Sequence, residues 1–250
     1  MKIPQTKVLV TGGGRGIGRA LVDGFHRDGA VVGIFERDPA LVDELRSAYS
    51  GLGGVWSCDV CDPESVDQAI ELAASEGFEP DVLINNAGII HSEPLVNMTV
   101  RGDRVHSRES WRRVLTADLD SVFFVTSRVV DRMMRRRCKG VVISISSISA
   151  CGNPGQSAYS AAKAGVNALT LTWAKELGPL GYRFVAIAPG FLDTPSTRSA
   201  LSETTLARLQ QQIPLRKLGD TDAIYSAARH IVENDYLTGT VISVDGGLTL

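Results

Sequence analysis

The chain has 250 residues, of which 44% are hydrophobic and 22% are charged, and its formal net charge is −2. These values are ordinary for a globular protein, and a nearly neutral chain gives no electrostatic reason to expect a nucleic acid or an anionic membrane as a partner. No apolar stretch approaches the ~18 residues of a membrane span, and no signal peptide is visible. We therefore expect a cytoplasmic protein.

Strands and helices alternate along the first half of the chain. Residues 7–11 form an apolar, β-branched run that predicts a strand, and the glycine-rich stretch after it leads into a helical pattern that ends at Gly29. A helix that begins at Pro39 and another at 63–75 alternate with strands predicted at 30–35, 55–58 and 82–84.

The second half continues this alternation, with helices predicted at 111–137 and 157–177 and strands at 141–146, 184–187 and 241–244. Such a pattern indicates parallel strands joined by right-handed crossovers, which is an α/β doubly wound parallel sheet (a Rossmann fold) with helices on both faces. No linker and no shift in composition divides the chain, so we predict a single domain over residues 1–250.

Two segments do not fit the alternation. Residues 97–110 are rich in charged side chains and predict a surface excursion, for which a solvated loop and a substrate-related role are both open. Residues 197–212 are polar and helix-prone, and we expect them to form a mobile cover over the site.

The cysteines do not complete a metal site. Cys58 and Cys61 have the spacing of a ligand pair, but neither Cys138 nor Cys151 forms a second pair with a nearby Cys or His. We therefore predict no bound metal and four reduced thiols.

A tyrosine and a lysine are spaced for proton transfer within the helix predicted at 157–177. An isolated phenol titrates near ~10, so it is a poor acid or base at neutral pH, but a neighbouring cation favours its ionised form. Tyr159 and Lys163 are one helical turn apart and therefore share a helix face. A cluster of serines at 144–149 precedes them.

A glycine loop lies between the first strand and the first helix. Gly12, Gly16 and Gly18 occupy the position at which a dinucleotide-binding fold needs a tight turn and a close approach of its backbone to a pyrophosphate. The N-terminus of the helix that follows favours the negative charge of that group.

The cofactor is selected at the end of the second strand. Glu36 stands where a carboxylate accepts hydrogen bonds from the ribose hydroxyls of the adenosine, and it would repel a 2′-phosphate, so NAD is favoured. Arg15 and Arg37 could each bind that phosphate, and NADP therefore stays possible.

These residues resemble the motifs of the short-chain dehydrogenase/reductase family over nearly the whole chain. Residues 11–18 are similar to its TGxxxGxG loop, residues 85–88 to its NNAG motif, and residues 245–247 to its C-terminal DGG. Tyr159 and Lys163 match its YxxxK motif. The resemblance implies a dinucleotide site formed by Gly12, Arg15, Gly16, Ile17, Gly18, Glu36, Arg37, Asp59, Val60, Asn86, Ala87, Gly88, Tyr159, Lys163, Pro189, Gly190 and Thr194.

The resemblance also implies a mechanism. Tyr159 would donate a proton to the substrate oxygen during reduction or accept one during oxidation, Ser147 would hold that oxygen, and Lys163 would favour the phenolate and bind the nicotinamide ribose. In this family the helix that carries the tyrosine usually forms a subunit interface, so a homotetramer or a homodimer is expected.

Two positions depart from the family pattern. Counting along the strand from Gly140 assigns the catalytic serine to Ser147, whereas counting back from Tyr159 assigns it to Ser146; we expect Ser147, because a strand has a fixed rise and loops absorb deletions. Asp118 stands where the family usually has a catalytic asparagine. Its charge would stabilise protonated Lys163, and we expect an active enzyme with a shifted pH optimum.

The sequence therefore predicts an enzyme that transfers a hydride between NAD(H) and a small-molecule secondary alcohol, polyol or ketone. One alternative is an NADPH-dependent 3-oxoacyl-thioester reductase, suggested by the stretches 152–156 and 213–215. Another is a dinucleotide-binding protein without catalysis, which only Asp118 favours.

Overall fold

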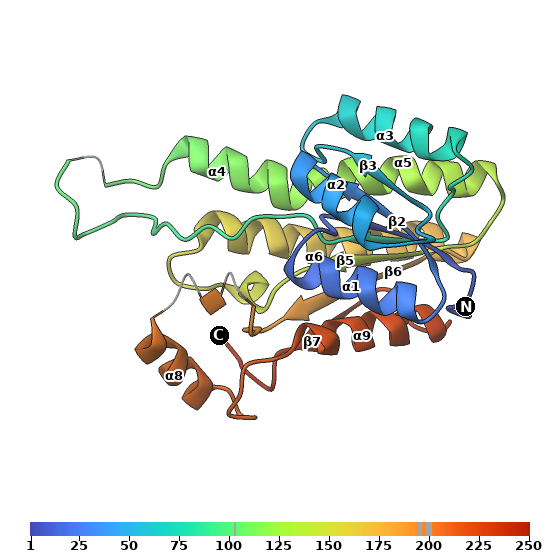
Figure 1. Ribbon diagram of the computed structural model, residues 1–250. Coiled ribbons are helices and arrows are strands. Elements are labelled where there is room, and N and C mark those ends of the chain that lie inside the picture. The colour runs from blue at the N-terminus through green and yellow to red at the C-terminus, as the bar shows by residue number, and fades with distance from the viewer. Residues whose placement is uncertain (103, 195–196, 199–201) are drawn as a thin grey trace.

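The computed structural model describes residues 1–102, 104–194, 197–198 and 202–250. Within these residues, seven parallel strands form one sheet in the order β3-β2-β1-β4-β5-β6-β7 (Figure 1). The predicted α/β doubly wound sheet is confirmed. The strands are β1 (Lys7–Thr11), β2 (Val31–Glu36), β3 (Gly54–Ser57), β4 (Val82–Asn85), β5 (Val141–Ile145), β6 (Arg183–Pro189) and β7 (Thr240–Val244).

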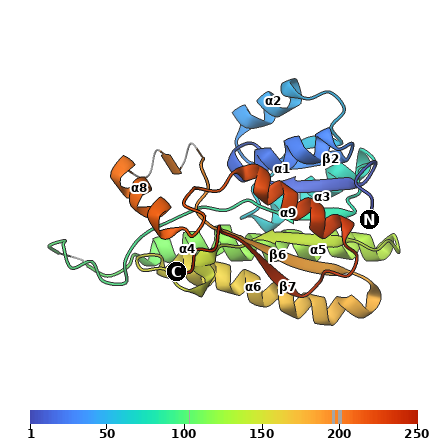
Figure 2. The same ribbon diagram turned by 90° about the horizontal axis from the view of Figure 1, so that it is seen from below.

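Helices cover both faces of the sheet, and β6 and β7 lie between α9 and α6 in Figure 2. The helices are α1 (Gly16–Arg27), α2 (Pro39–Ala48), α3 (Pro63–Ser75), α4 (Arg108–Leu115), α5 (Ser121–Arg135), α6 (Ser157–Leu177), α8 (Glu203–Gln212) and α9 (Thr221–Glu233). Short turns named η1 (Thr116–Asp120), η2 (Ile148–Cys151) and η3 (Gly178–Leu180) complete them.

The core follows from the alternation of side chains along buried strands. In β1, Val8 and Val10 point into one cluster, with side chains of α1 and α9, whereas Leu9 points into the other, with side chains of α3 and α5. All three are at most 1% exposed. A strand buried on both faces explains why the sequence shows continuous apolar runs there rather than alternation with polar residues.

The prediction of one continuous helix over 111–137 is wrong, because the helix starts earlier and is interrupted. It begins at Arg108, inside the segment predicted to be irregular, because the Ser107 hydroxyl accepts a hydrogen bond from the Ser110 amide and caps the first turn. A π-helical turn, η1, then separates α4 from α5. Such a turn inserts one extra residue and changes the apolar periodicity too little to be recognised in a sequence.

Helix α9 was not predicted from the sequence, although Asp220 caps it and five of its side chains are buried. In the segment predicted as a mobile cover, residues 203–212 form α8, and residues 199–201 lie outside the described residues.

Residues 94–106, which we call the arm, extend away from the body of the molecule between β4 and α4 (Figure 1). Its two limbs pair at the bridge between Val96 and Val105, and the His106 amide donates to the Leu95 carbonyl at 3.0 Å. Leu95 and Val105 are largely exposed. The predicted surface excursion is thus confirmed for residues 97–107, apart from residue 103, which lies outside the described residues.

Arg183, the first residue of β6, binds the end of α9 and the residues that follow it. Its guanidinium donates to the carbonyls of Ile231, Val232, Asn234 and Leu237 at 2.7–3.1 Å, and its side chain is 11% exposed. The carbonyls of Ile231 and Val232 belong to the last turn of α9, whose acceptors have no intrahelical partner. We expect Arg183→Met to lower the free energy of unfolding by roughly 2–3 kcal/mol, since it removes charge-assisted bonds and leaves the carbonyls unpaired.

Urea denaturation of the wild type and the variant measures this effect. Arg229→Met is the matched control on the exposed face of α9, where Arg229 pairs, among the described residues, with Asp28 and Glu233. Its expected cost is below about 1 kcal/mol. Equal costs for the two variants would contradict the role given to Arg183.

Candidate active site

The predicted site residues meet at the carboxyl edge of the sheet. The glycine loop follows β1 and residues 86–88 follow β4, and these two strands are neighbours although they are not consecutive in the chain. Strand order therefore reverses between them, and ligands of open α/β sheets bind at such a switch point.

The glycine loop leaves no room for a side chain at Gly12 or Gly18, whereas a Cβ on Gly16, whose φ is +52°, would meet no atom within 4 Å. A Cβ on Gly18 would lie 2.0 Å from the carbonyl oxygen of Gly12, and one on Gly12, whose φ is +65°, would lie 3.0 Å from the Cα of Ala87. Arg15 precedes the first turn of α1 and makes no side-chain hydrogen bond to cap it. Its guanidinium instead pairs with Asp38 at 3.1 Å. The Arg15 side chain therefore leaves the first backbone amides of α1 uncapped. Uncapped amides at a helix N-terminus can donate to a pyrophosphate.

Asn86 fastens the glycine loop to the end of β4. Its side-chain amide donates to the carbonyls of Thr11 and Gly12 at 3.0 and 2.9 Å, while the Thr11 hydroxyl accepts from the amides of Asn86 and Ala87. Ile17, at the start of α1, packs against the core cluster on the face of α1 and α9. The hydrogen bonds hold the predicted dinucleotide-binding residues of the two loops side by side.

Glu36 ends β2 and turns back over the glycine loop. Its carboxylate accepts hydrogen bonds from the amides of Gly14, Arg37 and Asp38 at 2.9–3.2 Å. The guanidinium of Arg37 lies 3.7 Å from the carboxylate of Asp59, which follows β3. The neighbouring residue Val60 packs into the cluster on the α3 and α5 face.

Tyr159 and Lys163 lie on one face of α6, as predicted. Both are buried, at 8% and 4% exposed, and the Lys163 ammonium is 5.6 Å from the centre of the Tyr159 ring. The ammonium donates to the carbonyl of Ile145 at 3.0 Å and pairs with the carboxylate of Asp118 at 3.1 Å. The lysine is therefore fixed from the end of β5 and from η1, and its charge is held beside the phenol.

Asp118 is almost wholly buried in η1. Burial raises the pKa of its carboxyl above the ordinary value, and Lys163 and the amide of Ile89 only partly oppose this effect. Both of its oxygens lie 3.3 Å from the Ile89 nitrogen, which donates to them. A Cβ on Gly88 would lie 2.4 Å from one of them, so the glycine admits the carboxylate.

The two candidate serines have different surroundings. Ser146 is 2% exposed, and its hydroxyl donates to the carbonyl of Lys163 at 3.3 Å. This hydrogen bond joins α6 to the end of β5 and uses the hydroxyl hydrogen of Ser146. Ser147 is only partly buried, and its hydroxyl oxygen accepts from the Ser149 amide at 3.1 Å. The hydroxyl hydrogen of Ser147 has no acceptor within this turn, which favours Ser147 as the group that contacts a substrate.

The end of β6 completes the edge. The Gly190 amide, directly after Pro189, donates to the Val244 carbonyl at 3.0 Å, and a Cβ on Gly190 would lie 2.7 Å from the Cα of Asp245. Thr194 is 7% exposed, and its hydroxyl lies 2.9 Å from that of Thr197. The predicted nicotinamide side is thus adjacent to β5, which carries Ser147 at its end.

Sequence reasoning missed a polar network beside these groups. The amide of Glu93 donates to the carbonyl of Gly155 at 2.6 Å, and the side chain of Gln156 bonds to Ser92 and Ser149. No local pattern signals such contacts, because the partners come from three separate segments.

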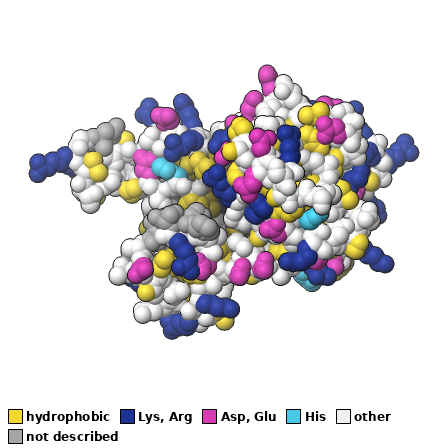
Figure 3. Space-filling view, in the orientation of Figure 1, with side chains coloured by type: hydrophobic (Ala, Val, Ile, Leu, Met, Phe, Trp, Pro, Cys, Tyr) yellow, Lys and Arg dark blue, Asp and Glu magenta, His cyan; other side chains and the backbone are white. Residues whose placement is uncertain are grey.

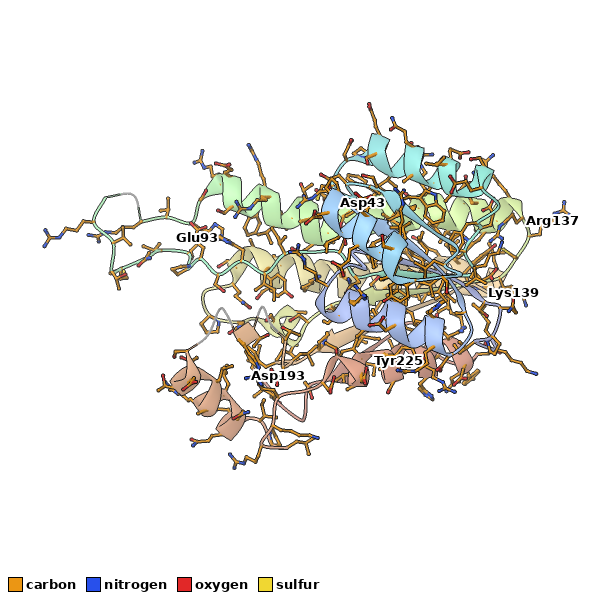
Figure 4. The ribbon with its side chains drawn as sticks, viewed as in Figure 1. Asp43, Glu93, Arg137, Lys139, Asp193 and Tyr225 are labelled. Atoms are coloured by element: carbon orange, nitrogen blue, oxygen red, sulfur yellow. The ribbon has the colours of Figure 1, made fainter. Side chains whose placement is uncertain are left out.

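Glu93 closes the base of the arm (Figure 4). Its carboxylate lies 2.9 Å from His91 Nε2 and accepts from the Ser107 amide at 2.6 Å, and these bonds lower the pKa of Glu93 to about 2. The Nε2 atom of His91 thus lies against Glu93 at the base of the arm. The surface is hollowed between the arm, α8 and the body of the molecule (Figure 3).

The described residues contain no group of three His, Cys, Asp or Glu side chains that could hold a metal ion, and all four cysteines are unpaired. In the described part of the chain, no helix is long and apolar enough to span a membrane.

A glycine cradle at a switch point, a carboxylate at the end of β2 and a buried Tyr–Lys pair define a Rossmann-fold oxidoreductase. A family model described as Enoyl-(Acyl carrier protein) reductase matches residues 12–249. The chain belongs to the short-chain dehydrogenase/reductase family, whose members are NAD(P)-dependent enzymes that act on CH–OH and C=O groups of small molecules.

Curated relatives match over nearly their whole length. The 3-oxoacyl-[acyl-carrier-protein] reductase FabG of Thermotoga maritima is 35% identical and covers 100% of both chains. The (3R)-3-hydroxyacyl-CoA dehydrogenase of Homo sapiens is 33% identical and covers 99% of this chain and 97% of its own. The structure of a putative gluconate dehydrogenase from Agrobacterium tumefaciens superposes with a TM-score of 0.87 at 27% identity, covering 98% and 96% of the two chains.

Proposed function

We propose that this protein is an NAD-dependent dehydrogenase of a small polar secondary alcohol or polyol, or equally a reductase of the corresponding ketone. The observation that carries the proposal is the buried arrangement of Tyr159, Lys163 and Asp118 next to the glycine cradle. When bound, the nicotinamide ring exchanges a hydride with the substrate carbon.

Tyr159 is the general acid and base of the proposed mechanism. Its phenol donates a proton to the carbonyl oxygen during reduction and takes the hydroxyl proton during oxidation. Lys163, held by Asp118 and the Ile145 carbonyl, keeps a positive charge beside the ring and so favours the phenolate that forms when the proton leaves. Ser147 donates its free hydroxyl hydrogen to the same substrate oxygen and orients it.

The preference for NAD rests on the charges around Glu36. Its carboxylate, fixed by three backbone amides, lies at the end of β2 where the adenosine ribose binds in this fold. The two arginines that could neutralise a 2′-phosphate, Arg15 and Arg37, are already paired with Asp38 and Asp59. A 2′-phosphate would therefore meet the carboxylates of Glu36, Asp38 and Asp59, while the two nearby guanidinium groups are already paired.

Titration of the purified protein with NADH and NADPH, followed by cofactor fluorescence, tests this preference. We expect NADH to bind at least ~10-fold more tightly, and we expect Glu36→Ala to reduce that ratio to near unity, since a single charge at this range is worth about 1.4 kcal/mol or more. Asp43→Ala, which removes the same charge from the exposed face of α2 (Figure 4), is the control and should keep the ratio. Tighter binding of NADPH by the wild type would overturn the preference.

A second candidate is a 3-oxoacyl-thioester reductase that uses NADPH. It is favoured by the names of two relatives, a 3-oxoacyl-[acyl-carrier-protein] reductase and a (3R)-3-hydroxyacyl-CoA dehydrogenase. The gluconate dehydrogenase name of a structural neighbour favours the polyol class. Rates with a panel of polyols and with acetoacetyl thioesters separate the two candidates.

We also propose a homo-oligomer. Phe123 on α5 and Leu171 on α6 are exposed apolar side chains on the two helices that cover β4 to β6. Burying such side chains against a second copy would remove apolar surface from water.

A further inference from the structure

The serine turn and the tyrosine helix are joined by a short loop that contains two glycines. Ser147 caps the start of η2, Tyr159 is in the first turn of α6, and residues 152–156 connect these two elements. Gly152 and Gly155 have φ values of +104° and +82°, and a Cβ at either would meet no atom within 4 Å. At these two points the backbone of the loop is not sterically restricted. The loop is held by backbone hydrogen bonds, among them the one from the Glu93 amide to the Gly155 carbonyl, and by contacts of its side chains.

Gln156 supplies those contacts. It directly precedes α6, and its carbonyl accepts from the Ser160 amide at 2.7 Å, so its backbone moves with the turn that carries Tyr159. Its side-chain oxygen accepts from the Ser149 hydroxyl and from the Asn153 side-chain amide, both at 2.9 Å. Ser149 is 6% exposed, and its own amide donates to the Ser147 hydroxyl oxygen.

The other end of the Gln156 amide is held by a third segment. Its nitrogen donates to the Ser92 hydroxyl at 3.2 Å, and the next residue, Glu93, donates from its backbone to the Gly155 carbonyl at 2.6 Å. Glu93 is in turn bonded to His91 and to the Ser107 amide. This attachment fixes the orientation of the amide, so that its oxygen faces the serine turn.

We propose that Gln156 is a positioning residue that fixes the Ser147 hydroxyl relative to the Tyr159 phenol. The inference rests on the proposed function, in which these two groups act on the same substrate oxygen. Gln156 acts through Ser149, because its contacts are with the turn that bears Ser147 and not with the reacting atoms. Among the described hydrogen bonds, the bond between Gln156 and Ser149 is the one that a side chain of residues 152–156 makes to this turn. The Ser146 hydroxyl separately bonds to the Lys163 carbonyl of α6.

The test compares two replacements of similar length. Gln156→Met loses every polar contact, and we expect kcat to fall ~10- to 100-fold, since a misplacement of about 1 Å has effects of this size. Gln156→Glu keeps an oxygen that accepts from Ser149 and Asn153, and kcat should recover to within about threefold of the wild type. The Kd for NADH, measured by fluorescence, should be unchanged in both.

A double-mutant cycle tests whether Gln156 acts on Ser147 through Ser149. Ser149→Ala should lower kcat to a similar extent as Gln156→Met, and the double variant should be no slower than the worse single variant, because both remove the same link. Gln68→Met, on the exposed face of α3, is the control for the replacement itself.

The outcomes distinguish this inference from the proposed function. A wild type with no activity on either polyols or thioesters would overturn the proposed function. An active wild type with an equally active Gln156→Met variant, or with additive losses in the cycle, would overturn the positioning role. A lower melting temperature with unchanged kcat would assign Gln156 to stability alone.

Discussion

Replacing Tyr159 by phenylalanine is expected to lower kcat about 10²–10⁴-fold, the range that a positioned general acid or base contributes. The ring is buried against Ala158 and Val114, and phenylalanine preserves this packing. Only the hydroxyl is lost, so the fold and the cofactor site should remain. Steady-state rates in both directions measure the loss, and NADH fluorescence measures the cofactor affinity.

Tyr182→Phe is the matched control for this experiment. Tyr182 is as buried as Tyr159, at 6% exposed, but it belongs to the cluster on the α3 and α5 face. It should retain the wild-type kcat within about twofold. A Tyr159→Phe variant that keeps more than about a tenth of the wild-type rate would remove the phenol from the proton transfer.

Asp118→Ala is expected to destabilise the protein by roughly 3 kcal/mol, because it leaves the buried Lys163 ammonium without its counterion. It also removes the acceptor of the Ile89 amide. Denaturation in urea measures the change. Asp120→Ala, in the same η1 turn, loses only a hydrogen bond from the Thr116 hydroxyl, and it should cost about 1 kcal/mol or less.

Asp118→Asn separates charge from shape. Asparagine can still accept from the Ile89 amide, but it no longer opposes the positive charge of Lys163, so the ammonium favours the phenolate more strongly. We expect the rising limb of the oxidation rate to move to lower pH by on the order of one unit, which corresponds to about 1.4 kcal/mol.

The raised pKa of Asp118 also predicts the pH below which the substitution no longer changes the rate. Burial raises the pKa of Asp118, so in the wild type the carboxyl takes up a proton at a higher pH than an exposed aspartate does. Above that pKa the wild type carries a negative charge that the variant lacks, and below it both are neutral. The reduction rates of the two proteins should therefore differ at neutral pH and converge on acidification. Identical profiles for the two would disprove the electrostatic role of Asp118.

Much of the fold could be predicted because its signals are local. The boundaries of α3 and α6 agree with the predicted 63–75 and 157–177, since caps and apolar periodicity depend on residues within a few positions. The broken helix was not predictable in the same way. The η1 turn carries Asp118, which pairs with Lys163 on another helix, and such a long-range contact leaves no local signal in the sequence.

The sequence by itself determined the family, the glycine cradle, the acid at the end of β2 and the Tyr159–Lys163 spacing, because neighbours along a strand or helix have a geometry set by the backbone. Only the tertiary structure decided how the two serines differ, how Asp118 pairs with Lys163 and how Gln156 joins three segments. Those contacts join residues far apart in the chain, and their distances follow from how the helices pack on the sheet rather than from any local pattern.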